Sequence, residues 1–351
     1  MREETMRFVS GHARIVIAIG IVAAAVTSIV MSVAYGAQSS GAPVAWKSVS
    51  VSVKPVELGV ERVGALRFRG GLELDCGDPA FGGISGLEVR PDNSFLAVTD
   101  MGTWIAGRLE LDAASGALRG VTNVWIAPML DERGAPLRSK DESDAEGLTL
   151  LGGGRVAVSF ERTQIIRVYR LGADANAGAN LPGIAEHGPL LDGVRDLSPN
   201  LGLEALATFG DGDRLVVGSE QGDSRGARIW TTTTDATAPA PPVAHLSLAD
   251  GYGFVGLDQL PDGDFIALER AYSPELGVRI RVLRIAANSI REGGDIHADS
   301  LAELARPLEL DNFESVSAVT LSSGTRIYVI ADDNFSPAQR TLLYAFDLEK
   351  P

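Results

Sequence analysis

Short runs of apolar residues, separated by turns rich in glycine and aspartate, follow one another along most of the chain. Residues 145–161, AEGLTLLGGGRVAVSFE, form two such runs around a glycine turn. Gly and Asp tolerate positive φ, so a turn of this composition connects two antiparallel strands. The same pattern recurs at residues 84–100, 203–220, 254–269 and 314–333. The sequence therefore predicts five related hairpins.

Further apolar runs flank each hairpin. Third strands are predicted after the hairpins, at residues 103–111, 165–171, 227–232, 278–285 and 341–348. Fourth strands are predicted at residues 66–74, 121–130, 243–248 and 306–310, with a weaker one at 187–192. Four antiparallel strands repeated every ~50–60 residues are typical of propeller blades with long loops. We predict an all-β fold, a single β-propeller of five to six four-stranded blades.

The two ends of the repeat region predict how the ring closes. The strand at 66–74 has no blade of its own and can add to the last blade beside residues 341–348, which removes exposed sheet edges. A sandwich of two stacked sheets is the alternative fold. It accounts for alternating strands but not for a repeat with an acid at a fixed place.

The N-terminus predicts export. Arg2, Arg7 and Arg14 precede an uncharged run at 15–34, which is typical of a signal peptide and is also long enough for a membrane anchor. Either reading places the rest of the chain in the periplasm or outside the cell. The predicted organisation is a signal peptide or anchor at 1–37, a linker and leading strand at 38–65, and the propeller domain at 66–351.

Composition narrows the choice of partners and metals. The net charge of −15 argues against nucleic acid or an anionic membrane surface as a partner. Cys76 is the only cysteine and the four histidines are widely spaced, so neither a disulfide nor a zinc site of the usual kind is expected. Any metal would be a hard cation with oxygen ligands. We expect a monomer that acts on a small molecule.

Carboxylates occupy the same places in successive hairpins. Three begin a first strand and five end a second strand, and these are Glu146, Glu204 and Glu314, followed by Asp100, Glu161, Glu220, Glu269 and Asp332. In a propeller these places share one mouth of the central channel, so we expect an acidic ring there. Such a ring needs counterions, either Arg162 and Arg270 or a bound Ca²⁺. For any single acid, capping a turn or pairing with an arginine is the simpler explanation.

Nucleophilic catalysis finds little support. GGISG at 82–86 lacks the final glycine of a serine elbow, because residue 87 is leucine, and it precedes a strand. No histidine lies in a repeated motif, and neither a phosphate-binding loop nor a dinucleotide fingerprint is present.

Five motifs resemble those of the secreted phytase-like proteins, also called "esterase-like activity of phytase". The motifs are GGISGLEV…LAVTDMG, DAEGLTLL…VAVSFER, NLGLEALA…VVGSEQ, YGFVGLDQLPDGDFIALER and DNFESVSAV…IYVIADDNF, within residues 66–350. The resemblance implies a β-propeller related to calcium-dependent phytases and hydrolysis of a phosphoester or an ester.

Applied to these positions, the resemblance implies metal-assisted hydrolysis. Glu146, Glu204, Glu314, Asp100 and Asp332 would hold Ca²⁺. Glu161, Glu220 or Glu269 would act as general base, and Arg162 and Arg270 would bind substrate oxygens. Lys and Arg are sparse in these motifs, which argues against phytate as the substrate. The alternatives are a calcium-dependent lactonase-type propeller and a non-enzymatic envelope binding protein with structural calcium.

Overall fold

The computed structural model describes residues 46–171, 184–210, 212–292 and 294–349. The segment expected to be a signal peptide or anchor lies outside these ranges. In the described part of the chain, no helix has the length and apolarity needed to cross a membrane.

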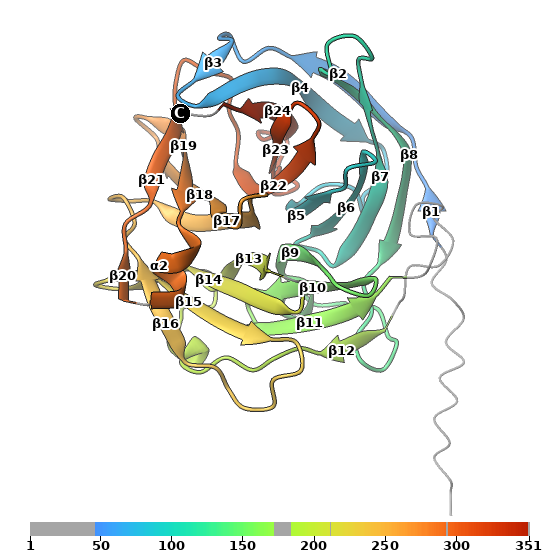
Figure 1. Cartoon of the computed structure of the whole chain (residues 1–351). Helices are drawn as coiled ribbons and strands as arrows, with labels where there is room; N and C mark the ends of the chain where they lie inside the picture. Colours follow the sequence, from blue (N-terminus) through green and yellow to red (C-terminus); the bar gives the residue numbers. More distant parts are fainter. Residues whose placement is uncertain (1–45, 172–183, 211, 293, 350–351) are drawn as a thin grey trace, which may run out of the picture. The chain divides into compact units, whose positions relative to one another are not determined.

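Five sheets are arranged around a common centre as the five blades of a β-propeller (Figure 1). The innermost strands are β5, β9, β13, β17 and β22, and each contacts its two neighbours around the ring. The fold is all-β, as predicted, and the blade number is five. The sandwich alternative is wrong.

Blades 1 and 2 are formed mainly by residues 84–187. From the centre outward, blade 1 consists of β5 (Ile84–Val89), β6 (Ser94–Thr99), β7 (Thr103–Leu111), β8 (Leu118–Pro128) and β1 (Lys47–Ser48). Blade 2 consists of β9 (Ala145–Leu151), β10 (Arg155–Phe160), β11 (Ile165–Arg170) and β12 (Ala185–His187). A single-turn helix, α1 (Lys140–Ser143), connects the two blades.

Blades 3 and 4 repeat this plan. Blade 3 consists of β13 (Leu203–Phe209), β14 (Arg214–Asp223), β15 (Gly226–Thr233), β16 (Pro242–Leu246) and a parallel outer strand, β20 (Gly294–Ile296). Blade 4 consists of β17 (Gly253–Gln259), β18 (Phe265–Ser273), β19 (Gly277–Ile285) and β21 (Asp299–Leu304). A 3₁₀ turn (Val194–Asp196) precedes blade 3, and α2 (Ala287–Glu292) follows β19. The fourth strand predicted at 306–310 is wrong: that segment is a turn and loop, and β21 takes the outer position.

Blade 5 closes the ring with strands from both ends of the propeller. Its strands are β22 (Phe313–Leu321), β23 (Gly324–Ala331), β24 (Thr341–Leu348), β4 (Leu66–Cys76) and β2 (Val51–Val56), with β3 (Arg62–Val63) beside β4. Strand β4 runs antiparallel to β24, with Leu74 opposite Thr341 and Leu66 opposite Leu348. The predicted closure is confirmed. Main-chain hydrogen bonds join strands from the two ends of the propeller within blade 5. The ring is therefore closed, with no gap between the last blade and the first.

Side chains also connect neighbouring inner strands, which are not paired to one another through their main chains. In four blades a polar residue within the inner strand accepts a hydrogen bond from a main-chain N–H of the next blade. The pairs are Glu88 with Leu150 at 3.2 Å, Thr149 with Thr208 at 3.1 Å, Asp258 with Ala318 at 2.6 Å and Ser317 with Val89 at 2.9 Å. These bonds satisfy N–H groups that would otherwise be buried without partners. They connect neighbouring inner strands beneath the mouth of the propeller.

Candidate functional site

One backbone irregularity recurs in every blade, at the start of the inner strand. There the pairing with the second strand skips one residue, which makes a β-bulge; the skipped residues are Ser85, Glu146, Glu204, Val255 and Glu314. A bulge turns a side chain out of the alternating pattern of the strand and is common next to active sites. The inner acids of the predicted ring therefore share a defined backbone geometry.

The residue that follows each bulge is small because neighbouring inner strands approach one another closely at this point. A Cβ on Gly147 would lie 2.5 Å from the carbonyl oxygen of Glu204 in the next blade. A Cβ on Gly86 would lie 2.7 Å from the carbonyl oxygen of Glu146, and the equivalent position of blade 4 is glycine as well. Close approach of neighbouring inner strands thus requires the Glu-Gly and Ser-Gly pairs seen in the sequence.

A second set of side chains comes from residues at or near the ends of the second strands. In four blades this residue is an acid whose N–H donates to the carbonyl two residues before the bulge. The bonds join Asp100 to Gly83 at 2.9 Å, Glu161 to Asp144 at 2.9 Å, Glu220 to Gly202 at 2.7 Å and Asp332 to Asn312 at 3.0 Å. In blade 4 the same position, opposite Gly253, holds Arg270. The ring at this level has four acids and one arginine.

Glu269 does not belong to that ring. It is paired with Phe254, one position earlier than the ring acids of the other blades. Its side chain is 0% exposed and forms an ion pair with Arg281 on the neighbouring strand, outside the acidic cavity. Successive residues of a strand point to opposite faces, so the shift of one residue removes this acid from the site.

The remaining predicted residues line one cavity of about 310 Å³ at the propeller mouth. It holds seven of the eight predicted acids together with Arg162 and Arg270, and it also contains Lys140, Asp144 and three asparagines, Asn200, Asn312 and Asn334. Its eight carboxylates exceed its three cationic side chains by five charges when all are ionised. No histidine or cysteine is among the described residues that line it.

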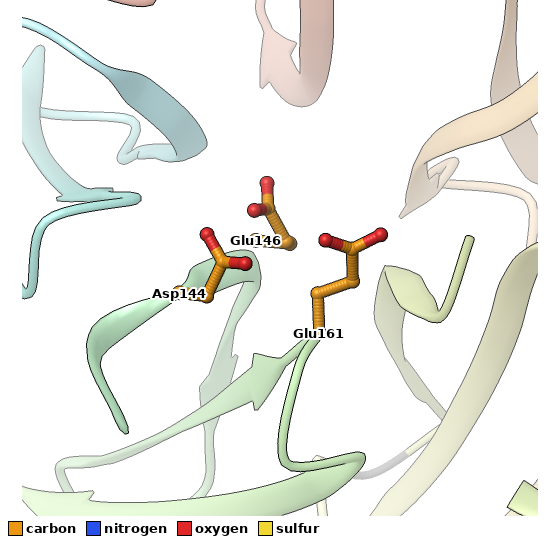
Figure 2. A group of neighbouring side chains, drawn as sticks. All are labelled: Asp144, Glu146 and Glu161. Atoms are coloured by element: carbon orange, nitrogen blue, oxygen red, sulfur yellow. The ribbon is translucent and has the colours of Figure 1, made fainter. Parts of the chain in front are cut away.

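Two groups of three carboxylates lie at the blade 2 and blade 3 side of this cavity. Asp144, Glu146 and Glu161 point toward one another (Figure 2), with one oxygen of each within 4.8 Å of the others. Glu161, Glu204 and Glu220 form a second such group. Glu161 belongs to both, so five carboxylates surround a small volume.

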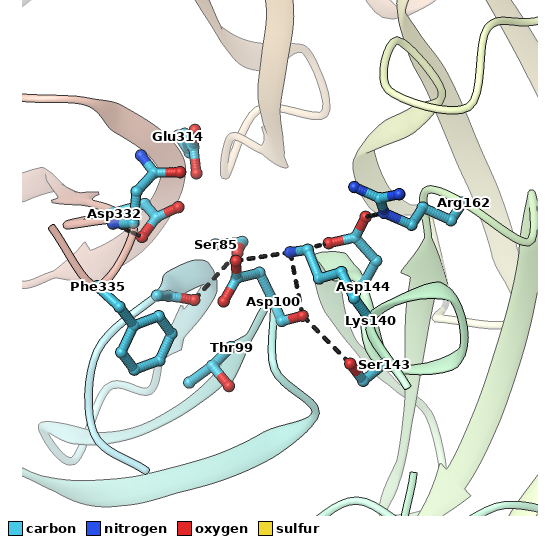
Figure 3. Close-up of polar contacts among 12 residues, drawn as sticks. Ser85, Thr99, Asp100, Lys140, Ser143, Asp144, Arg162, Glu314, Asp332 and Phe335 are labelled. Carbon is cyan, nitrogen blue, oxygen red and sulfur yellow. Dashed lines mark hydrogen bonds and ion pairs between the residues drawn. The ribbon is translucent and has the colours of Figure 1, made fainter. Parts of the chain in front are cut away.

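Basic residues neutralise one flank of this volume. Lys140 lies between Asp100, at 2.6 Å, and Asp144 (Figure 3). The Nε of Arg162 is 2.9 Å from Oδ2 of Asp144. Lys140 comes from α1, the helical turn that leads into blade 2. Asp144 is buried, and these ion pairs hold its carboxylate in place.

Arg270 neutralises the opposite flank. It forms ion pairs with Glu314 and, at 3.4 Å, with Glu220. Asn312 donates to Glu314 at 2.7 Å and accepts from Arg270. By contrast, the carboxylate of Glu146 makes no hydrogen bond or ion pair with any described residue.

Burial and mutual repulsion raise the pKa of several ring acids. Burial, opposed by the N–H of Gly202 and reinforced by Asp144 and Glu220, raises the pKa of Glu161 to about 7. Burial, with Glu314 and Asp100 nearby, raises the pKa of Asp332 to about 9. The same causes hold the pKa values of Glu146 and Glu204 well above the usual range. Without a bound cation the ring therefore retains protons at neutral pH.

The sequence reasoning missed two charged members of the site. Asp144 lies two residues before the bulge of blade 2, where blade 5 has Asn312 and the other blades have glycine. An alignment extended two residues upstream would have found it. Lys140 belongs to an inter-blade connection with no counterpart in the other blades, so the repeat carries no signal for it.

The fold and cavity together define a β-propeller with a carboxylate-lined centre. A family profile described as "Phytase-like: Esterase-like activity of phytase" matches residues 79–335, and the chain belongs to this family. A solved structure provisionally named a gluconolactonase is 13% identical, with a TM-score of 0.43, and the match covers 88% of this chain and 94% of the other. That likeness is too loose to bear on the chemistry. No curated protein matches the chain.

Proposed function

We propose that this protein is an exported, calcium-dependent hydrolase of phosphoesters or carboxylic esters. The observation that carries the proposal is the pair of three-carboxylate groups that share Glu161 at the propeller mouth. Membership of the phytase-like family supports a hydrolase on this scaffold.

The residues present fit Ca²⁺. The ion takes about 6–8 oxygen ligands from carboxylates, amide carbonyls and water, and the cavity offers carboxylate and asparagine oxygens. Zinc and copper favour nitrogen and sulfur ligands, which the described lining does not supply. Glu146 is a carboxylate without a partner in the midst of a net negative cluster, which is the arrangement expected around a cation.

We place the ion between Asp144, Glu146 and Glu161, with Glu204 beside them. When bound, calcium supplies a positive charge that attracts a substrate oxygen and acidifies water. Arg162 and Lys140 hold Asp144 in place from the far side.

Two residues between the ion and open solvent would carry the chemistry. Glu220 lines both the acidic cavity and a neighbouring cavity of about 840 Å³, so it is placed to take a proton from the attacking water. Arg270, held by Glu220 and Glu314, would donate to an anionic substrate oxygen. Glu269 has no role in this scheme because its side chain lies outside the cavity.

The acids of blades 1 and 5 face the same cavity from the other side. Asp100, Glu314 and Asp332 would strengthen cation binding through their charge, and they would serve as ligands when a second ion binds.

The test is hydrolysis of an aryl phosphate, an aryl carboxylic ester and a lactone, each with calcium and with chelator. Phosphate or ester turnover that chelator abolishes supports the proposal, and turnover of the lactone alone would favour a lactonase. If chelator lowers only the melting temperature and nothing is cleaved, the protein is a binding protein with structural calcium.

Two variants separate the proposed roles. Glu220→Gln should lower kcat by roughly 10²-fold or more, as loss of a general base does, while leaving most calcium affinity. Glu146→Gln should instead lower calcium affinity. Glu110→Gln, an exposed acid on β7 outside the cavity, is the matched control and should change neither.

A further inference from the structure

A second cavity adjoins the acidic one on the same face of the propeller. It has a volume of about 840 Å³, which is within the range of small-molecule sites. Glu220, Arg270 and Asn312 line both cavities, so the two are separated only by these side chains. We call the larger one the blade 4–5 groove.

The walls of this groove combine apolar surface with an available cation. One wall is the end of the β18–β19 hairpin, where Tyr272 pairs with Val278 and is 69% exposed. The other is the connection into blade 5, which contributes Arg306 and Leu308. A tyrosine this exposed at a cavity wall presents a flat apolar face that is left open to solvent and can pack against a bound molecule.

The position of Arg306 depends on a glycine. A Cβ on Gly277 would lie 2.6 Å from Nε of Arg306, so the guanidinium occupies the space that a side chain would fill. Arg306 donates to the carbonyl of Glu275 at 3.4 Å and has no carboxylate partner among the described residues. It therefore keeps donors for an oxygen of a bound molecule.

Electrostatics direct an anionic substrate to this side of the ring. Every other blade has at least one acid at the two ring positions, whereas blade 4 has Val255 and Arg270. The break in the acidic ring therefore faces the blade 4–5 groove. The groove also contains Glu309 and Asp311, and Arg340 forms ion pairs with both of these carboxylates.

We infer that the blade 4–5 groove binds the organic part of the ester, and that this part is an aromatic group that packs on Tyr272. The inference rests on the proposed function, because the acidic cavity must hold the ester or phosphate itself. Arg306 would bind an oxygen substituent on the aromatic group. Specificity would then lie in blades 4 and 5, and metal binding in blades 2 and 3.

The experiment compares two ligands that cannot be hydrolysed, 1-naphthylphosphonate and methylphosphonate, by calorimetry in calcium. Wild type should bind the naphthyl compound about tenfold more tightly, and Tyr272→Ala should reduce that preference roughly 3- to 10-fold. Leu276→Ala is the matched control, since Leu276 is 54% exposed on the same hairpin but does not line the groove. It should keep the wild-type preference.

The outcomes separate this inference from the proposed function. Equal affinities for the two phosphonates, failure of both to bind, or a preference that survives Tyr272→Ala would overturn the groove assignment. A preference that depends on Tyr272, in a protein that hydrolyses no ester, would support the groove while refuting the hydrolase.

Discussion

Replacing Glu146 with Gln should stabilise the protein in chelator and destabilise it in calcium. The glutamine keeps the shape of the side chain and removes one charge from the centre of the acidic cavity. In chelator the variant should melt above wild type, because repulsion among the ring acids is relieved. In calcium it should melt below wild type, because a ligand is lost.

The size of the effect follows from the distances in the cavity. Oxygens of Asp144, Glu146 and Glu161 lie within 4.8 Å of one another. At an effective dielectric constant of ~20, each such pair of charges repels by about 3 kcal/mol. Protonation and nearby Lys140 and Arg162 reduce that cost, so we expect a gain of about 1–3 kcal/mol in chelator at pH 8. This corresponds to roughly 2–8 °C.

Calcium acts in the opposite direction. A ligand at 100 times its dissociation constant stabilises the native state by about 2.7 kcal/mol, and the variant should lose most of this. The assay is thermal unfolding of wild type, Glu146→Gln and the control Glu110→Gln, in chelator and in millimolar calcium at pH 8. A Glu146→Gln variant with the wild-type response to calcium would refute the assignment of the ion to this carboxylate.

Three further predictions follow from the cavity and the inner strands. In chelator, stability should fall as pH rises from about 5 to 8, because Glu161 with its pKa of about 7 holds a proton in the folded state that the unfolded chain releases above about 4.5; the calcium-induced rise in melting temperature should grow over the same range. Glu269→Gln should leave calcium affinity unchanged and should lower stability by about 1–3 kcal/mol, because Arg281 loses its buried partner. Gly147→Ala should cost about 1–3 kcal/mol in denaturant unfolding, since its Cβ would meet a main-chain oxygen at 2.5 Å.

Each of these has a result that contradicts it. A calcium response independent of pH would mean that the ring acids do not exchange protons for the ion. A loss of calcium affinity in Glu269→Gln would place that acid in the site. For Gly147, the control is Gly77→Ala, because Gly77 has no positive φ and its Cβ would meet nothing within 4 Å; equal costs for the two variants would refute the close approach of inner strands.

Most of the fold could be predicted from the repeat in the sequence. In a hairpin, the turn of Gly and Asp residues determines which two strands pair. The strand at 66–74 could be assigned to the last blade because, in a closed ring, the edge of that blade is the position left unpaired. The outer strand of blade 4 was misplaced because outer strands are short and lie at the blade edge. Their apolar pattern is weak and resembles that of the loops around them.

The site residues that occupy equivalent positions in successive blades could be predicted from the sequence, and the others could not. The spacing in the sequence does distinguish Arg270 from Glu269, because Asp100, Glu161 and Arg270 each lie 14 residues after the glycine that follows the bulge. Matching the hairpins by the acid at their end, and not by this spacing, hid the offset of one residue. The ion pairs of Lys140 depend on how a connecting turn folds over the mouth. The groove is formed by loops of two blades, and its contacts are not local in sequence.

The most direct test of the central claim is a diffraction experiment on crystals grown with calcium or a lanthanide substitute, with anomalous scattering used to locate the ion. We predict an anomalous peak between Asp144, Glu146 and Glu161, with carboxylate oxygens about 2.3–2.6 Å from calcium. A crystal at saturating calcium with no peak in the acidic cavity would contradict the account.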